Sequence, residues 1–338
     1  MTVPARSTQS LIDELVRVTG ATSPEEAIRI KTCELIATHV HAIGEPSIPM
    51  NMDVLASLRS ISRADEKPLF SPDAELSPDG AGGVTMRVNP DRPETRQRFS
   101  IAHEISHTFF PDYETKDWCR TDARYRNRAN PAEFLEMLCD IAAAELLFPQ
   151  PWFDRDAATV QDASDLAALA TKYLASREAT IRRFAETSSE DVVAVYFVWK
   201  LKPTQKGTVG RKDQGNLFEI SPEELRQDAL RLRIEYSVPS PAFRAAGYYL
   251  PIDKSIENNG PVYEAAATGM PATGECFLDL GQAAGKYRVL AVPLWTTQNE
   301  RGASDEHAVA AVLRPLSVRK PSRSKAPADD ERTLFNEL

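Results

Sequence analysis

The sequence His-Glu-Ile-Ser-His, within residues 96–112, places two histidines four residues apart. On a helix, residues at this spacing lie one above the other on the same face. His103 and His107 can therefore direct their imidazoles to one point, as two ligands of a metal ion must. Glu104 is rotated away from that point, so its carboxylate can reach a water molecule beside the ion and act as a general base.

This pattern also has an ordinary explanation, because a chain of this length contains His-Glu-x-x-His by chance in roughly one case in two hundred. The surrounding residues argue against chance, since they are apolar on nearly every side of the helix: Phe99, Ile101, Ala102, Ile105, Phe109 and Phe110. Two imidazoles and a carboxylate are costly in a buried helix unless a partner such as a metal satisfies them. The sequence therefore predicts a buried helix that ends at Pro111 and carries part of a metal site.

A catalytic zinc usually has a third protein ligand, and no further histidine follows His107 at short spacing. His307 is remote, and His39 and His41 have no partner at ligand spacing, so we interpret them as structural. The strongly helical sequence "NPAEFLEMLCDIAAAELLFP", residues 130–149, instead offers four carboxylates: Glu133, Glu136, Asp140 and Glu145.

Among these carboxylates, Glu136 and Asp140 share one helix face. One can bind the metal while the other accepts a hydrogen bond from a ligating imidazole. Glu133, one turn earlier, is the reserve ligand, and Glu145 is interpreted as a surface residue.

Together, "RFSIAHEISHTFF" and "EMLCDIAAAELLFP" resemble the ImmA/IrrE family of metallopeptidases. That family is similar in having Arg-Phe before His-Glu-x-Gly/Ser-His, and a helix of the form Glu-x-x-Ala-Asn/Asp-x-x-Ala-Ala-x-Leu-Leu-x-Pro. The sequence departs at Cys139, where the family has alanine, and has Ser106 where glycine is frequent. The resemblance is strong over residues 84–149 and extends to about residue 187.

The resemblance implies that His103, His107 and Glu136 bind the metal and that Glu104 is the catalytic base. It places Asp140 where the family has an Asn or Asp that supports a ligand. The implied metal is Zn²⁺, with Mn²⁺ as the alternative. The implied activity is endopeptidase cleavage of a protein substrate, a helix-turn-helix repressor, which switches on stress or mobile-element genes.

The expected fold class is α+β, with three parts before the tail. Residues 1–160 are predicted to form a helical, zincin-like metallopeptidase domain with a small sheet, and residues 161–188 a helix-turn-helix-like segment. Residues 189–316 have a strand pattern that predicts a mixed α/β domain. This domain resembles a GAF-like sensory domain, which could receive a small-molecule signal. Residues 317–338 are rich in proline, serine and charge and are predicted to be disordered.

The helix-turn-helix-like segment raises an alternative function, that of a DNA-binding transcriptional regulator using the peptidase fold as a scaffold. We expect two helices joined at Ala175–Ser176, and Arg177, Arg182 and Arg183 supply positive charge there. A net charge of −9 argues against a protein that mainly binds nucleic acid. The intact Glu104 favours the enzyme, because a scaffold has no need of a base.

Composition favours a cytoplasmic protein. The four cysteines form no Cys-x-x-Cys pair and suit reduced thiols. No apolar run reaches the roughly 18–20 residues of a membrane span, and the first residues lack a secretory signal. We therefore expect no membrane partner.

Two features of the catalytic mechanism stay open at the level of sequence. The strand expected over residues 84–88 precedes the histidine helix and could offer an edge with which an extended substrate pairs. The oxyanion of the reaction needs a donor besides the metal, and Tyr113, Arg124 and Tyr125 are the candidates, among which the sequence does not choose.

Overall fold

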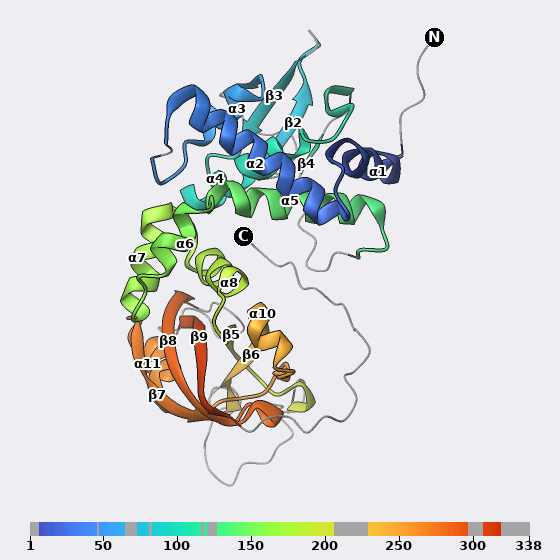
Figure 1. Cartoon of the computed structure of the whole chain (residues 1–338). Helices are drawn as coiled ribbons and strands as arrows, with labels where there is room; N and C mark the ends of the chain where they lie inside the picture. Colours follow the sequence, from blue (N-terminus) through green and yellow to red (C-terminus); the bar gives the residue numbers. More distant parts are fainter. Residues whose placement is uncertain are drawn as a thin grey trace, which may run out of the picture. The chain divides into compact units, whose positions relative to one another are not determined.

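The computed structural model describes residues 7–45, 47–64, 73–80, 83–115, 118–119, 127–205, 229–296 and 307–318. The chain divides into two compact units. Among the described residues, unit 1 comprises those up to Arg155 and Ala170–Ala179, and unit 2 comprises Asp156–Leu169 and those from Thr180 onwards. Both mix helices and strands (Figure 1), so the expected α+β class is confirmed, whereas the domain boundaries stay predictions. Arg124, Tyr125 and residues 319–338 of the predicted tail lie outside the described residues.

Unit 1 begins with three helices: α1 (Thr8–Thr19), α2 (Pro24–Ile43) and α3 (Met52–Leu58). The local sequence explains where α2 begins and ends. The Ser23 hydroxyl accepts a hydrogen bond from the N–H of Glu26, and Pro24 occupies the first turn, where no amide hydrogen is needed. The helix ends at Gly44, whose positive φ of 101° suits glycine. None of the helices in the described parts of the chain is long and apolar enough to cross a membrane.

A small mixed sheet follows, with strands β1 (Ile61–Arg63), β2 (Ala74–Pro78), β3 (Val84–Val88) and β4 (Trp118–Cys119). Their order is β1-β3-β2-β4, with β1 parallel to β3 and β2 antiparallel to both β3 and β4. The expectation that residues 84–88 offer an edge to substrate was wrong, because β3 lies between β1 and β2. Strand pairing is non-local, so the sequence next to the helix could not show it.

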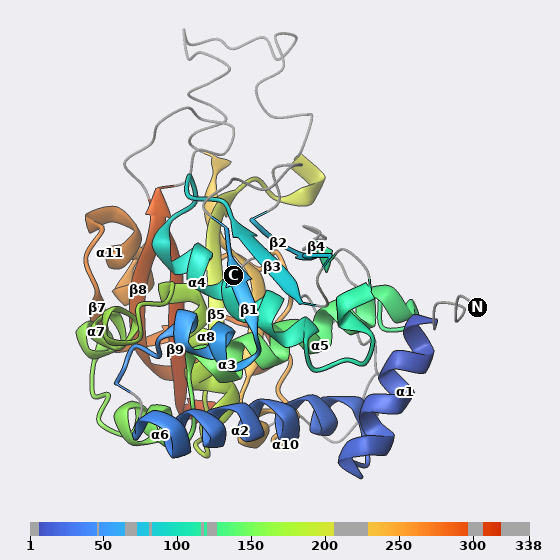
Figure 2. The same cartoon turned by 90° about the horizontal axis from the view of Figure 1, so that it is seen from above.

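Two buried helices carry the predicted site residues: α4 (Glu94–His107) and α5 (Pro131–Leu147). They pack against each other, and α2 lies along α5 (Figure 2). Asn130 caps α5 by accepting a hydrogen bond from the N–H of Ala132 at 3.1 Å. Helix α4 ends at His107, earlier than expected, and the chain continues to Phe110 in tight turns.

Between α4 and β4 the chain forms η1 (Tyr113–Thr115), and after α5 it forms α6 (Trp152–Ala157), α7 (Ala163–Tyr173) and α8 (Arg177–Thr187). The turn expected at Ala175–Ser176 is confirmed. Leu174 adopts a positive φ of 49°, and the Ser176 hydroxyl accepts a hydrogen bond from the N–H of Ala179. This pairing of helices follows from local capping chemistry and does not by itself indicate DNA binding.

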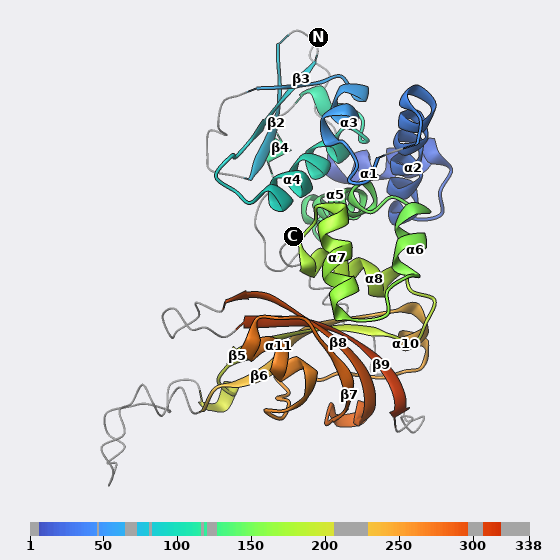
Figure 3. The same ribbon diagram turned by 90° about the vertical axis from the view of Figure 1, so that its left-hand side faces the viewer.

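Unit 2 contains a five-stranded antiparallel sheet in the order β6-β5-β9-β8-β7. Its strands are β5 (Val193–Lys200), β6 (Arg231–Pro239), β7 (Ala272–Leu278), β8 (Gly285–Thr296) and β9 (His307–Val318). Its other elements are η2 (Pro203–Gln205), α10 (Pro241–Ala245), α11 (Gly260–Thr268) and η3 (Gly281–Ala283). Helix α11 lies against β7, β8 and β9 (Figure 3). The core forms on the face of β5 that carries Val193, Val195 and Phe197, as the period of two in a strand requires.

Candidate metal centre

The two histidines of the motif stand in the last turns of α4 and are fully buried. Their ring centroids are 5.0 Å apart, so the spacing of four residues does bring the imidazoles together. Glu104 is fully buried beside them, and its Oε2 lies 4.0 Å from Nε2 of His107. This part of α4 therefore concentrates three titratable groups in the buried interior.

Helix α5 brings two of its carboxylates to the same place. Oδ1 of Asp140 lies 2.9 Å from Nδ1 of His103, and Oε2 of Glu136 lies 3.1 Å from Nε2 of the same ring. The other oxygen of Glu136 lies 3.7 Å from Nε2 of His107. The Glu136 carboxylate thus faces the Nε2 atoms of both imidazoles, whereas Asp140 contacts the far side of one.

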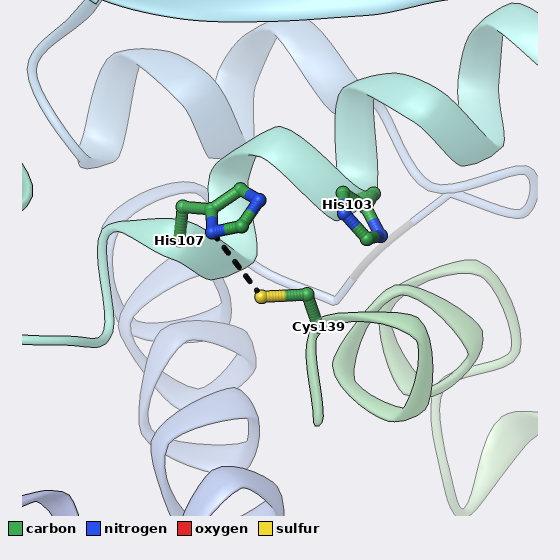
Figure 4. Close-up of side chains that lie close together, drawn as sticks. All are labelled: His103, His107 and Cys139. Atoms are coloured by element: carbon green, nitrogen blue, oxygen red, sulfur yellow. Dashed lines mark hydrogen bonds between the residues drawn. The ribbon is translucent and has the colours of Figure 1, made fainter. Parts of the chain in front are cut away.

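Cys139 adds a thiol to this group. Its Sγ lies 3.5 Å from Nδ1 of His107 (Figure 4), and it is fully buried. His103, His107 and Cys139 each offer one ligand atom, and these atoms lie within 4.8 Å of one another. The sequence comparison singled out Cys139 only as a departure from alanine and assigned it no contact with the site.

Two donor sets share the same pair of histidines. In one, the Nε2 atoms of both rings act with Glu136; in the other, Cys139 acts with one nitrogen of each ring. Either set fits a divalent metal, because imidazole, carboxylate and thiolate are all established Zn²⁺ ligands. We favour the set with Glu136, since Asp140 and Cys139 then orient the Nδ1 atoms while both Nε2 atoms face one carboxylate.

The electrostatics of the pair also favour a cation. Burial alone would lower the pKa of His103, but hydrogen bonds with Asp140 and Glu136 outweigh it and raise that pKa to about 9. In the metal-free protein a proton on His103 therefore balances part of the negative charge of the two carboxylates. A metal ion that displaces this proton would perform the same balancing.

Two residues that sequence reasoning missed hold the end of α4. The ring of Trp118 stacks on His107 with centroids 4.4 Å apart and an interplanar angle of 25°. Nε of Arg59 donates to Oγ1 of Thr108 at 2.8 Å, and a second guanidinium nitrogen donates to the Thr108 carbonyl. A cation at the carboxyl end of a helix also complements its dipole. No local pattern links either residue to the histidines, because both arrive through tertiary packing.

The other candidates lie elsewhere. Glu133, the reserve ligand, accepts a hydrogen bond from Asn130 at the start of α5. Glu145 pairs with Arg29 at a nitrogen to oxygen distance of 3.3 Å. His307 stands in β9 of unit 2, and His39 and His41 are in α2, the first buried and the second exposed. Of the three oxyanion candidates the structure describes only Tyr113, in η1.

Comparison with known proteins gives a peptidase family for the part of the chain that carries this site. Residues 70–185 match the family described as Peptidase_M78, IrrE N-terminal-like domain, so this part of the chain belongs to the ImmA/IrrE family. The resemblance stated from the two motifs is confirmed over these residues.

Two further comparisons were made with the whole chain. No curated protein matches it. Among solved structures, a Mycobacterium tuberculosis transcriptional regulator is similar with 11% sequence identity and a TM-score of 0.43. The match covers 91% of this chain and 82% of that one.

Proposed function

We propose that the protein is a metal-dependent endopeptidase that cleaves a protein substrate. One observation carries the proposal: in the segment that belongs to the M78 peptidase family, Glu136 faces the Nε2 atoms of both His103 and His107 at 3.1 and 3.7 Å. Glu104 lies next to the same nitrogen of His107. This combination supplies two imidazoles and a carboxylate for a metal and a second carboxylate for proton transfer.

In this proposal His103, His107 and Glu136 hold Zn²⁺, with Mn²⁺ as the alternative, because the donor set suits several divalent ions. When bound, the ion would polarise the peptide carbonyl and make a water molecule more acidic. Asp140 accepts the Nδ1 proton of His103, which selects the tautomer whose Nε2 lone pair is available to a metal.

Glu104 acts as base and then as acid. It takes a proton from the attacking water, whose oxygen forms a bond to the carbonyl carbon of the peptide. It then gives the proton to the leaving nitrogen as the carbon–nitrogen bond breaks, so that the products are a carboxylic acid and an amine. The proposal places the Glu104 carboxylate beside His107 for this transfer.

The resemblance to the ImmA/IrrE family supports a particular class of substrate, a helix-turn-helix transcriptional repressor. Cleavage would remove the repressor and switch on a stress or mobile-element response. The sheet of unit 2 with α11 against it is compatible with the GAF-like sensory domain proposed for residues 189–316, which would receive a small molecule or another signal. We keep a cytoplasmic location as part of this proposal.

The alternative of direct DNA binding loses support from α8. Arg182 pairs with Glu186 at 2.8 Å, and the exposed fraction of its side chain is 13%. Arg183 is buried, with 6% of its surface exposed. Phosphate contacts need side chains that reach solvent, so two of the three arginines that suggested DNA binding are used within unit 2.

The experiment that tests the proposal mixes the protein with helix-turn-helix regulators encoded beside its gene, with and without a chelator. We expect one regulator to be cut, and the cut to need both metal and Glu104. If the Glu104→Gln variant controlled the target genes as the wild type does, proteolysis would not be the function.

A further inference from the structure

The histidines and the base of the proposed active site are covered from solvent, whereas 15% of the Glu136 side chain and 11% of the Asp140 side chain are exposed. The described side chains of His103, Glu104 and His107 have no exposed surface. Trp118 covers His107 by ring stacking, and only 6% of its own surface is exposed. A peptide bond must come within hydrogen-bonding reach of Glu104 to be cleaved, so part of this cover has to move before a substrate binds.

Strand β4, which carries Trp118, occupies an edge that a substrate could use. It pairs antiparallel with β2, with Trp118 opposite Leu76 and Cys119 opposite Glu75. The other side of β2 is taken by β3. Because α4 also contacts β2 and β4, a peptide paired with this outer edge of β2 would pass beside His107.

We propose that β4 holds the site closed, and that an extended segment of the protein substrate replaces β4 on the outer edge of β2. The inference rests on the proposed peptidase function and adds how its site is covered and how its substrate binds. Addition of a strand to a sheet edge is a common mode of peptide recognition, since main-chain hydrogen bonds supply affinity whatever the sequence.

The contacts of β4 show what would hold it in place. Among the described residues, its ladder with β2 comprises the pairs Trp118–Leu76 and Cys119–Glu75. The side chain of Trp118 stacks on His107 and donates a hydrogen bond from Nε1 to the carbonyl of Tyr113 at 2.9 Å. Trp118 therefore anchors β4 to His107 and to the Tyr113 carbonyl.

The same geometry indicates which kind of substrate side chain fits opposite Leu76. Residues directly opposite each other in an antiparallel pair project to the same face. A substrate residue that replaces Trp118 opposite Leu76 therefore takes the place of the indole, on the same face of the sheet as buried Leu76 and against the ring of His107. A large apolar or aromatic side chain fits there.

The first test measures how fast EDTA removes Zn²⁺ from the full-length protein. Trp118→Ala removes the anchor, and we expect removal of the ion to become about tenfold faster or more, because the covered state opens more often. Trp118→Phe keeps an aromatic ring on His107 and should stay near the wild-type rate. Trp152→Ala, which removes a tryptophan from α6, is the control and should leave the rate of Zn²⁺ removal near that of the wild type. A wild-type rate in Trp118→Ala would overturn the inference.

The second test needs neither a variant nor a metal and covers the case in which Trp118→Ala does not fold. Hydrogen exchange of the wild-type protein compares the amides of residues 118–119 with those of Val84–Val88 in β3. A displaceable β4 should exchange about tenfold faster or more than the interior strand. Equal protection would show that β4 is a fixed part of the sheet and would overturn the inference.

The two tests separate this inference from the proposed function. If the wild-type protein binds no divalent metal, the peptidase proposal fails, while hydrogen exchange still decides whether β4 opens. If the protein binds metal and cleaves its substrate but both tests find β4 fixed, only the inference fails.

Discussion

Cys139 and Asp140, adjacent residues of α5, each contact the Nδ1 atom of a different site histidine. Asp140 lies 2.9 Å from Nδ1 of His103, and the sulfur of Cys139 lies 3.5 Å from Nδ1 of His107. One helix turn thus orients both imidazoles and leaves their Nε2 atoms facing Glu136. Groups that hold ligating histidines in this way usually have large effects on metal affinity.

Removal of the Asp140 carboxylate should weaken metal binding without abolishing it. We expect Asp140→Ala to raise the dissociation constant for Zn²⁺ by about 10- to 100-fold, because His103 loses the partner that sets its tautomer and ring orientation. Asp140→Asn retains an oxygen that can accept the Nδ1 proton and should have a smaller effect. Competition titration with a chromophoric chelator measures both, and Glu145→Gln is the control on the same helix. Unchanged affinity in Asp140→Ala would contradict the assigned role.

Cys139 can be distinguished as an orienting group or as a ligand by cobalt spectroscopy. If it orients His107, the Co²⁺-loaded protein should lack a sulfur-to-cobalt charge-transfer band. Cys139→Ser should then bind metal nearly as well as the wild type, whereas Cys139→Ala should bind several-fold more weakly. A charge-transfer band that disappears in Cys139→Ser would instead show that the thiolate is a ligand, in favour of the set with His103 and His107.

Glu104 should matter for the reaction far more than for metal binding. General base catalysis contributes about 10²- to 10⁴-fold to a rate, so Glu104→Gln should lower kcat for substrate cleavage by at least this order. The variant should still bind Zn²⁺ within a few-fold of the wild type, since Glu104 is not among the proposed ligands. Cleavage assays and metal titration on the same preparations check both statements. Full activity in Glu104→Gln would rule out its role as base.

The raised pKa of His103 predicts how the stability of the metal-free protein depends on pH. The folded-state pKa of about 9 exceeds the ordinary value of 6.5. The proton is therefore bound more tightly in the folded state. Its contribution to stability is complete below about pH 6.5 and is lost as the pH rises to about 9, by at most about 3 kcal/mol.

Urea unfolding of the chelated protein between pH 6 and 9.5 measures this loss. Asp140→Asn should flatten the dependence, because the charged partner of His103 is gone. His41→Gln, which changes an exposed histidine of α2, should leave it unaltered. Stability that stays constant or rises over this range in the wild type would contradict the predicted sign.

Local features of the sequence determined much of unit 1. The four-residue spacing of His103 and His107 brings their rings together on α4, and the same spacing puts Glu136 and Asp140 on one face of α5. Caps at Ser23, Asn130 and Ser176 set where helices begin, since a side-chain oxygen satisfies an amide only a few residues away. Such interactions act within one or two turns, so they can be predicted from neighbouring residues.

Only the tertiary structure decided which groups meet across elements. The packing of α4 on α5 assigned Glu136 to the Nε2 atoms and Asp140 to Nδ1, two roles that the spacing left interchangeable, and it added the thiol of Cys139. Non-local strand pairing placed β3 inside the sheet and brought Trp118 onto His107. The physical reason is that these contacts depend on how whole helices and strands bury their apolar faces, which no short stretch of sequence specifies.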